Sequence, residues 1–491
     1  MARSPTADDQ RSADPARGPM MIESVNRHAV EAFQDLSRCI GLDSAELGGT
    51  VRMTGGDFPR VSVHRLASAS SAALAALGVG VGALWRVRGG RGQDVEVDSA
   101  RALQGLRCHA YSRKNGRQLP IDKGPLSGYH RTGDGRWICI YASHVLGPFL
   151  DAALDLLGCS HEATAIAAAI SRWRGADLEQ ALNERRVPAA LVRSEAEWAA
   201  HPQGRWLAAR PVVAIDRVAE SPPEPLAPGD RPLSGLRVLD ITQALCGPSL
   251  ARAMAEQGAD VLRVASPHCA DPEAIVIDTG WGKRSTYLDF DDREDLARVE
   301  AIAADADMVI QSFRPGALDR RGLSAEELAM RRPGLIYVSV SGYGSGGPWA
   351  TRGAYEALGQ AVAGISHAES YQNRPRSVRT GTLNDYLAAY LGTAGALAAL
   401  LRRCRHGGSY HVKVSLARTS MWVRQLGTIA EAEQFLGLDY AEPTAPSLIS
   451  ADSPFGITTA LRPPIAYSVT PGHWALPPAP LGSSQPCWQP R

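Results

Sequence analysis

Asp385 is the residue of this sequence best suited to act as a nucleophile. It lies in GTLNDYLAAYLGTAGALAALLRR, Gly381 to Arg403, where a helical pattern begins near Tyr386. A carboxylate is ionised at neutral pH without a helper group, because its ordinary pKa is about 3.9. Asp385 or Asn384 could instead cap the helix, which is an ordinary role for these residue types. The two roles are compatible, since a helix N-terminus also stabilises an anion.

The segments around Asp385 alternate between buried strands and helices, as expected for βαβ units. Such alternation predicts a parallel sheet covered on both faces, with ligands at the carboxyl ends of its strands. The predicted strands are residues 238–241, 261–264, 308–310 and 335–338. The loops 242–248, 312–318 and 341–348 each follow a strand, so we expect them at one edge of the sheet. The glycines of the last loop can bring backbone close to a ligand, although they match neither a P-loop nor GxGxxG.

The composition is that of an ordinary globular protein. The 491 residues include 52 basic and 51 acidic side chains, and 44% are hydrophobic, so the overall charge does not favour nucleic acid as a partner. The eight cysteines are scattered without metal-ligand spacing, which predicts reduced thiols and no metal site. No apolar run is expected to approach the roughly 18 uncharged residues that cross a membrane. We therefore expect a cytoplasmic protein without a membrane partner.

Proline content and apolar patterning suggest how the chain is divided. Residues 1–19 have almost no large apolar side chain and are expected to be disordered. Five prolines between Ser221 and Pro232 predict an extended linker at a domain boundary. The predicted units are therefore a tail over residues 1–19, a first unit over 20–220, the linker over 221–232, a catalytic domain over 233–435 and a closing segment over 436–491.

The two halves also contain similar segments. ALWRVRGGRGQDVEV (Ala83 to Val97) aligns with LLRRCRHGGSYHVKV (Leu400 to Val414) at a constant offset, which also pairs Leu66 with Leu383. Any helix followed by a glycine turn and a Val-alternating strand would give a similar match. The alternative is a degenerate copy, in which Ser68 pairs with Asp385. On that interpretation the first half lacks the carboxylate and does not catalyse.

Six segments, in order, carry a resemblance to a known family. They are PLSGLRVLDITQALCGP (Pro232 to Pro248), AEQGADVLRV (Ala255 to Val264), WGKRSTYLDF (Trp281 to Phe290), ADMVIQSFRPGALDRRGL (Ala306 to Leu323), RPGLIYVSVSGYGSGGPW (Arg332 to Trp349) and the Asp385 segment. Together they resemble the family III CoA-transferases, the CaiB/BaiF group. The resemblance implies an α/β fold with a parallel-sheet, Rossmann-like CoA-transferase domain and a smaller α+β domain. GYHRTGDGRWICI (Gly128 to Ile140) resembles that smaller domain, so the chain looks like a rearranged or fused two-unit form.

The resemblance also implies an activity and a site. The activity is transfer of CoA from an acyl-CoA donor to a carboxylic acid acceptor through an aspartyl anhydride and an aspartyl-CoA thioester, with Asp385 as nucleophile and no metal. The residues that would contact coenzyme A are Gln243, Ala244 and Leu245 near the thioester, and Lys283, Arg284, Phe313 and Arg320 near the adenine and phosphates. A single Lys or Arg is more often solvated surface than a ligand contact. Ser312 replaces the family's usual Asn, and Ala265 and Ser266 replace charged residues, so CoA binding could differ.

Two other functions and two assembly states stay open at this stage. Acyl-CoA racemases and isomerases share the fold, but Tyr355 stands where their catalytic His is expected, so the base is missing. A catalytically weak CoA-binding pseudoenzyme is the second alternative. Family members form interlocked homodimers, and we expect a homodimer here, with a compact pseudo-dimeric monomer as the alternative.

Overall fold

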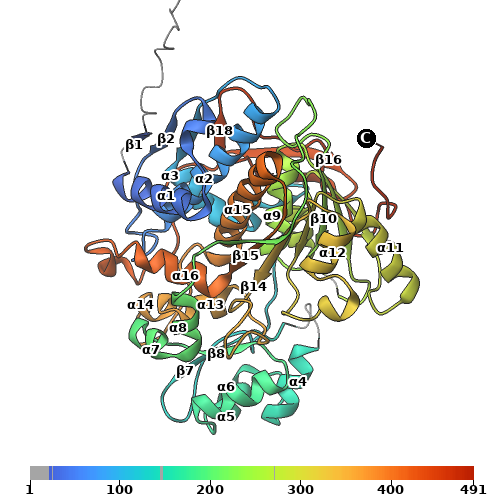
Figure 1. Ribbon diagram of the computed structural model, residues 1–491. Helices are drawn as coiled ribbons and strands as arrows, with labels where there is room; N and C mark the ends of the chain where they lie inside the picture. The colour runs from blue at the N-terminus through green and yellow to red at the C-terminus, as the bar shows by residue number, and fades with distance from the viewer. Residues whose placement is uncertain (1–21, 25, 144–147, 270, 491) are drawn as a thin grey trace, which may run out of the picture.

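The computed structural model describes residues 22–24, 26–143, 148–269 and 271–490 (Figure 1). The tail over residues 1–19 lies outside the described residues. A seven-stranded sheet, in the order β12-β11-β10-β13-β14-β15-β9, is the framework of the molecule. Its strands are β9 (Ala214–Ala219), β10 (Arg237–Ile241), β11 (Asp260–Ala265), β12 (Lys283–Tyr287), β13 (Met308–Gln311), β14 (Ile336–Ser341) and β15 (Ser409–Ser415).

The first six strands of this order are parallel, and β9 runs antiparallel to β15. The chain starts the parallel part at β10 and adds strands first on one side and then on the other, which is the Rossmann order. This confirms the predicted fold class. The order reverses between β10 and β13, and doubly wound sheets bind ligands at the carboxyl ends of the strands at that point.

Helices cover both faces of the sheet, and the alternation of side chains along each strand explains how. Val238 and Met308 belong to a core on one face, with α9 (Cys246–Glu256) and α15 (Asn384–His406). Leu239 and Val309, one residue further along their strands, belong to a core on the other face, with α11 (Arg293–Ala304) and α12 (Ala325–Arg331). The strands are therefore buried on both sides, as their continuous apolar runs indicate.

The proline-rich segment 221–232 is packed against the sheet. β9 before it pairs with β15, and β10 after it lies in the middle of the same sheet, so strands from both sides of the segment share one sheet. Glu224 forms an ion pair with Arg332, and the Ser221 carbonyl accepts a hydrogen bond from the Gly408 N–H. How many domains the chain forms stays a prediction, but the two sides of this segment are joined by backbone hydrogen bonds.

The N-terminal unit packs against the domain of the seven-stranded sheet through two long helices. α2 (Leu66–Val87) lies against α15 near the centre of the molecule, and a single core contains residues of both (Figure 1). The same unit contains α1 (Arg27–Ile40), α3 (Ser99–Gln104) and a sheet in the order β1-β2-β3-β18. Its strands are β1 (Ile22–Ser24), β2 (Val51–Thr54), β3 (Val95–Asp98) and β18 (Ile465–Tyr467).

The expectation that no apolar run reaches membrane-spanning length is wrong for α2. This helix is long and apolar enough to cross a membrane by length and composition, and its apolar stretch is entirely buried within the molecule. Ala, Gly and Ser supply much of its surface, and these small residues allow close helix packing. A Cβ built on Gly80 would lie 2.9 Å from the Leu397 Cβ, so α2 and α15 approach more closely there than a larger residue allows. Helix packing accounts for the apolar composition of α2.

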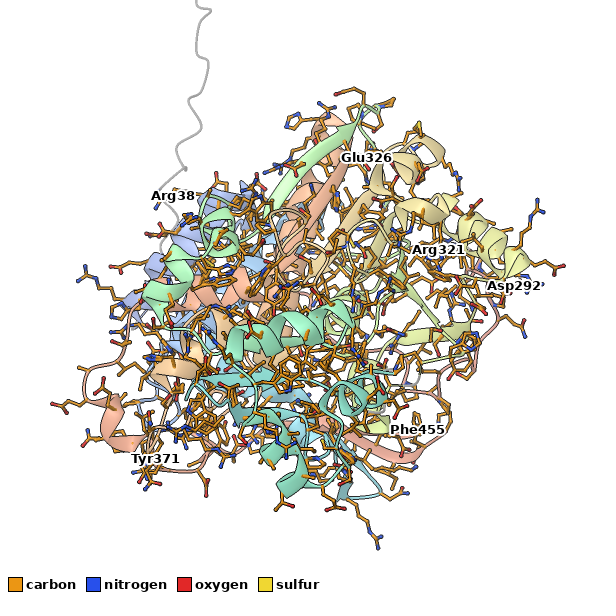
Figure 2. All side chains as sticks on the ribbon, turned by 90° about the horizontal axis from the view of Figure 1, so that it is seen from below. Arg38, Asp292, Arg321, Glu326, Tyr371 and Phe455 are labelled. Carbon is orange, nitrogen blue, oxygen red and sulfur yellow. The ribbon has the colours of Figure 1, made fainter. Side chains whose placement is uncertain are left out.

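A small domain lies below the large sheet in the view of Figure 1. It consists of a three-stranded sheet with helices on one face, and it has its own apolar core. In the view from below in Figure 2 its helices lie in front of the large sheet, while Asp292 and Phe455 lie towards the periphery. Its elements are β6 (Gly128–Arg131), β7 (Trp137–Ile140), β8 (Ala189–Leu191), α4 (Phe149–Leu157), α5 (Ala163–Ile170) and α6 (Gly175–Glu184).

Two further groups of elements join the small domain and the N-terminal unit to the catalytic domain. One is an aromatic cluster under the large sheet, containing α7 (Glu195–Ala200), α8 (Pro202–Ala208), α13 (Glu356–Val362) and α16 (Leu416–Gln425). The other is the C-terminal segment, in which β16 (Leu448–Ser453) pairs with β17 (Gly456–Leu461). β17 in turn pairs with β4 (Arg113–Lys114), which pairs with β5 (Arg117–Gln118). After β18, the tail runs along the β12 edge, where the Ser484 N–H donates to the Ser285 carbonyl. The short helices α10 (Glu273–Thr279) and α14 (Ile365–Ala368) complete the fold.

Candidate active site

Asp385 lies in the first turn of α15, where it lines two cavities. The larger cavity has a volume of about 1040 Å³ and the smaller one about 220 Å³. Neither Asn384 nor Asp385 caps the helix through its side chain, because the cap residue is Leu383. The carboxyl group of Asp385 is therefore available to a molecule bound in either cavity.

Glu356, in the first turn of α13, takes the place of a capping side chain. Its carboxylate accepts hydrogen bonds from the Asp385 backbone N–H at 2.7 Å and from the Gln360 amide at 2.6 Å. The Asn384 amide donates to the Glu356 carbonyl at 3.1 Å, and the Ser420 hydroxyl donates to the Asn384 side chain at 2.8 Å. These bonds fix the start of α15 through a buried side chain of another helix.

Burial raises the pKa of the Asp385 carboxyl well above its ordinary value, and the nearby charge of Glu356 raises it further, while Lys123 acts in the opposite direction. Burial also raises the pKa of Glu356, and the hydrogen bonds that it accepts lower it. Two carboxyl groups close together in a buried site compete to stay ionised. A substrate that brings positive charge or hydrogen-bond donors to Asp385 favours its nucleophilic form.

The larger cavity lies at the point where the strand order reverses. Gln243, Ala244 and Leu245 line it from the loop after β10, and Phe313 and Arg320 line it from the segment after β13. Residues of the small domain form the opposite wall, among them Phe149, Ala152, Gln180, Asn183 and Arg186. The lining of this cavity extends from Asp385 to loops of the small domain and to the loops that follow β10 and β13.

The loop at Gln243 is held by side chains from neighbouring strands. The Ala244 N–H donates to Asp271 at 3.0 Å, and Asp271 forms a buried ion pair with Arg263 of β11. The Gln243 N–H donates to the Ser312 hydroxyl at 3.3 Å, so the Ser that replaces the family's Asn binds the loop directly. Ala244 has a φ of 60°, a left-handed conformation that is unfavourable for Ala and is maintained by these contacts.

Lys283 and Arg284 line neither cavity. Lys283 is buried in the sheet, where its ammonium group forms an ion pair with Asp240 at 2.9 Å, and burial lowers its pKa to about 8. Arg284 forms an ion pair with Asp260 at 2.8 Å and donates to the Cys487 carbonyl of the C-terminal tail. Both side chains therefore have structural partners within β10, β11 and the tail, and the structure gives neither a position against a ligand in these cavities.

Two arginines at the larger cavity were not singled out from the sequence. Arg314 follows Phe313, and its guanidinium donates to the backbone carbonyl of Arg186 in the small domain at 3.3 Å. Burial lowers the pKa of Arg314, and the positive charge of Arg186 lowers it further. Neither guanidinium forms an ion pair with an acidic side chain among the described residues. Glu184 also lines this cavity, but no ion pair joins it to either arginine in the part of the chain that the structure describes. Two cations that face a cavity are suited to bind an anion such as a phosphate.

The smaller cavity shares Asp385 with the larger one and is lined largely by apolar groups. Ile121, Ile140 and Ile275 form much of its wall, and His109, Lys123, Tyr129 and Tyr141 add polar atoms. Tyr355 lies between the two cavities and stacks on Tyr141, with ring centroids 4.4 Å apart. Burial raises the pKa of Tyr355 above its ordinary range, so its phenol stays neutral at pH 7 and does not replace the missing histidine base.

The glycines of the loop after β14 have a packing role. Built Cβ atoms on Gly344 and Gly346 would each lie 2.6 Å from the Trp206 ring. The Gln203 amide donates to the Tyr343 carbonyl at 2.7 Å, which fastens α8 to the same loop. Gly342 alone among these glycines lines the larger cavity. No group of three or more His, Cys, Asp or Glu side chains that could hold a metal ion occurs in the described part of the chain.

Residues 233–435 match the sequence model described as CoA-transferase family III. This region is a family III CoA-transferase domain. An acetyl-coenzyme A transferase, nodX, of Hypoxylon pulicicidum is 31% identical over 334 residues, which are 63% of this chain and 56% of that protein. A succinyl-CoA–D-citramalate CoA-transferase of Chloroflexus aurantiacus is 33% identical over 203 residues, 38% of this chain and 49% of that protein. The chain thus spans about half the length of these relatives.

A solved structure of a CaiB/BaiF family protein from Brucella suis is also similar in sequence. It is 27% identical, covers 47% of this chain and 65% of that chain, and superposes with a TM-score of 0.37. The family III domain contributes Asp385, Glu356 and Arg314 to the site, whereas Arg186, Lys123 and His109 precede it in the chain. The cavities of the transferase domain are therefore closed by residues that lie outside the matched region.

Proposed function

We propose that this chain transfers CoA between an acyl-CoA and a carboxylic acid, with Asp385 as the covalent carrier. The observation that carries the proposal is that Asp385 lies between a cavity large enough for an extended nucleotide and a smaller, mostly apolar one. The family match and the transferase relatives support CoA transfer as the general reaction.

The first half of the reaction converts the acyl-CoA into a free acid and an aspartyl-CoA thioester. An oxygen of the Asp385 carboxylate attacks the thioester carbonyl, the carbon–sulfur bond breaks, and CoA leaves as a thiolate. The product is a mixed anhydride between Asp385 and the donor acyl group. The thiolate then attacks the Asp385 carbonyl carbon, and the donor acid leaves as a carboxylate.

The second half repeats these steps in reverse with the acceptor. The acceptor carboxylate attacks the aspartyl thioester, which breaks the carbon–sulfur bond and forms a new anhydride. The thiolate then attacks the acceptor's carbonyl carbon, and Asp385 is released as a carboxylate. Each bond formed matches one broken, and no net proton transfer is needed. The sequence of steps requires a carboxylate that faces both a CoA site and an acid site.

Charge and hydrogen bonding at the site suit these steps. Lys123 lines the smaller cavity and its positive charge lowers the pKa of Asp385, so it favours both the ionised nucleophile and an incoming carboxylate. The Asp385 backbone N–H donates to the Glu356 carboxylate, so Glu356 holds the helix terminus and the Asp385 side chain is left to react. The backbone dipole at the start of α15 further favours negative charge that develops at Asp385.

CoA fits the larger cavity in one orientation. Its thioester end must reach Asp385, so the Gln243 loop lies beside the pantetheine part. Arg186 and Arg314, which form no ion pair among the described residues, would then bind phosphate groups together with Arg320. Phe313 offers an apolar ring for the adenine end. On this assignment, CoA is held from both the transferase domain and the small domain.

Trapping the carrier tests the proposal directly. The protein is incubated with an acyl-CoA and hydroxylamine, and peptides are analysed by mass spectrometry. Hydroxylamine attacks an aspartyl anhydride or thioester and leaves a hydroxamate, which we expect at Asp385 only when acyl-CoA is present. Asp385→Asn serves as the control. Efficient CoA transfer without any label at Asp385 would show that the carrier has been assigned to the wrong residue.

A further inference from the structure

His109, in the N-terminal half of the chain, lines the smaller cavity although it lies far from Asp385 in sequence. Its ring and that of Tyr386 are stacked, with centroids 6.1 Å apart and planes 7° apart. Its Nε2 atom has no hydrogen-bond partner among the described residues, whereas its Nδ1 atom lies 3.3 Å from the Tyr386 hydroxyl. The question is whether Nε2 carries a proton, since a protonated nitrogen donates a hydrogen bond and a bare one accepts.

A chain of buried groups behind His109 answers this question. Arg252 forms an ion pair with Asp278 at 2.7 Å, and their side chains are 7% and 0% exposed. The Tyr386 hydroxyl donates to the other oxygen of Asp278 at 2.8 Å. A carboxylate only accepts hydrogen bonds, so the single proton of the phenol lies between Tyr386 and Asp278. The Tyr386 oxygen therefore has no proton left for His109.

The Tyr386 oxygen can only accept hydrogen bonds from His109. It accepts one from the His109 backbone N–H at 2.7 Å, and the ring Nδ1 faces the same oxygen. The Nδ1 atom must therefore carry the proton of the neutral ring, which leaves Nε2 with a free lone pair. Burial lowers the pKa of His109 to about 4, so the ring is neutral at pH 7. In the smaller cavity, His109 consequently offers a hydrogen-bond acceptor.

Apart from Asp385 itself and the Glu356 carboxylate, which already accepts hydrogen bonds from the Asp385 N–H and Gln360, most other polar groups of this cavity are engaged or act as donors. The Thr382 hydroxyl donates to the Leu106 carbonyl at 2.5 Å, and the Tyr129 hydroxyl is bonded to Ser366 at 2.8 Å. Lys123 is a cation, and the neutral phenols of Tyr141 and Tyr355 can donate. These donors can form hydrogen bonds with the carboxylate of an acid substrate. The His109 lone pair needs something that a carboxylate lacks, namely a proton donor on the substrate.

Resting on the CoA transfer proposed above, we propose that His109 Nε2 accepts a hydrogen bond from a hydroxyl group of the acid substrate, so that the substrates are short hydroxy acids. The cavity of about 220 Å³ has room for about seven water volumes of about 30 Å³ each, which suits a short acid rather than a long acyl chain. A site that binds a substrate hydroxyl rejects the analogue without it, because the buried acceptor then stays unpaired.

Matched pairs of acids test this directly in the intact protein. Malate is compared with succinate, and 3-hydroxybutyrate with butyrate, as acceptors from one acyl-CoA donor, using both enantiomers of each hydroxy acid. For at least one pair, we expect kcat/KM to be about tenfold or more higher for the hydroxy acid, the effect of one hydrogen bond to a buried acceptor. Equal kcat/KM values within both pairs would overturn the proposal.

Two variants of the same cavity separate hydroxyl recognition from a general role. His109→Phe should bring the hydroxy-to-deoxy ratio close to one, whatever its effect on the rate with either acid alone. Lys123→Met should lower both members of each pair equally and leave the ratio unchanged. A ratio that survives in His109→Phe contradicts the assignment, as does one that collapses in Lys123→Met alone.

The wild-type ratio should also depend on pH in a way that a structural role does not predict. The charged groups around His109 are Asp278 of α10, Lys123 and Arg107. At a pH near 4, about half of the His109 rings are protonated and lack the lone pair, so the preference for the hydroxy acid should be about halved there and disappear at lower pH. Ionisation of Asp385 affects both acids and cancels in the ratio, and each kcat/KM value is expressed per concentration of the ionised acid because the two substrates titrate differently near pH 4. A ratio that is constant down to pH 4 would count against the proposal without needing a variant that folds.

Failure of this inference is distinguishable from failure of the proposed function. If hydroxamate forms at Asp385 and the deoxy acids are used as well as the hydroxy acids, CoA transfer stands and hydroxyl recognition by His109 is wrong. If no hydroxamate forms and no acid accepts CoA from any donor, the function assigned to Asp385 fails, and the inference about His109 fails with it.

Discussion

The helices α15 and α2 pack against each other, and their first turns are built alike but differ in chemistry. At the start of α15 the Asp385 N–H donates to the Glu356 carboxylate at 2.7 Å. At the start of α2 the Ser68 N–H donates to the Asp57 carboxylate at 2.9 Å. The sequence offset pairs Ser68 with Asp385, so in both units an acid from elsewhere in the chain holds the backbone at the matching position.

The side chains at the two positions differ in what they face. Ser68 is fully buried and its hydroxyl donates back to Asp57 at 2.7 Å, whereas Asp385 lines two cavities. Neither cavity is lined by Ser68. The comparison indicates that the contact between an acid and the helix start does not require a carboxylate at the paired position. The proposed reaction needs a carboxylate at the paired position and a cavity that this carboxylate lines.

The strongest test of this comparison removes the carboxylate that only one helix has. Asp385→Asn keeps the backbone N–H and nearly the same shape, but an amide is a poor nucleophile and cannot form the anhydride. We expect CoA transfer to fall at least a thousandfold, with cooperative thermal unfolding preserved. Steady-state assays and calorimetry measure the two effects. A variant that keeps more than a few percent of wild-type turnover would rule out Asp385 as carrier.

Glu356→Gln tests what the holding acid does for the nucleophile. The Glu356 charge raises the pKa of Asp385, so its removal should shift the acid limb of the pH–rate profile to lower pH. Glu356 accepts hydrogen bonds from the Asp385 N–H and the Gln360 amide, and the NH₂ group of Gln cannot accept one of these. The start of α15 would then be held less well, so kcat should fall about tenfold or more. An acid limb that stays in place or moves to higher pH would show that the two carboxyls are not coupled.

The pH dependence of stability gives a third test, of intermediate size. The pKa of Asp385 is raised in the folded protein, so its contribution to stability is fully present below about pH 4 and is lost as the pH rises through the folded-state pKa. Asp385→Asn has no such group. Its free energy of unfolding should therefore match the wild type at pH 4 and exceed it at pH 7, by about 1.4 kcal/mol for each unit of pKa shift. Denaturant titrations at both pH values measure the difference, and a difference that does not change with pH would contradict it.

The smallest effect is expected at the paired position of α2. Ser68→Ala removes hydrogen bonds to Asp57 and Asn26, so we expect the protein to lose about 1 kcal/mol of stability. Turnover should stay within about twofold of wild type, because Ser68 touches neither cavity. A large loss of turnover at unchanged stability would mean that the α2 position takes part in the reaction.

Sequence patterns could predict the parts of the site that lie in consecutive βα loops. Asp385, Phe313, Arg320 and the Gln243 loop line the larger cavity, as the carboxyl ends of parallel strands lead one to expect. Lys283 and Arg284 were predicted to contact CoA, but they lie within β12, where the sheet supplies Asp240 and Asp260 as partners. From sequence alone, a basic pair in a strand could either contact CoA or form ion pairs within the sheet, and only the acidic residues on the neighbouring strands decide between the two.

The remaining residues of the site could not be predicted from local pattern. Arg186 and His109 reach the cavities from the N-terminal half, and no motif links them to Asp385. Glu356 could have been noticed in the sequence, since it is the only charged residue of the segment EALGQAVAGI, residues 356–365. The apolar stretch of α2 was underestimated because Ala, Gly and Ser make it less conspicuous than a run of Leu or Ile.

Whether a second chain is part of the assembly stays a prediction. The apolar faces of α2 and α15 already cover each other within one chain, so the argument that each half leaves apolar surface uncovered does not require a homodimer. The interface that a homodimer would use is therefore a different surface.

The pairing of α2 with α15 also sets a condition on biosynthesis. The ribosome completes α2 at Val87, but its packing partner begins at Asn384. At about 5–20 residues per second, the apolar helix waits roughly 15–60 s before that partner can be translated. Contacts between such distant segments also slow folding, because the loop between them must be closed first. The nascent chain of this protein should therefore depend on chaperones that bind exposed apolar helices, and depleting them should reduce the yield of native protein more than its stability once folded.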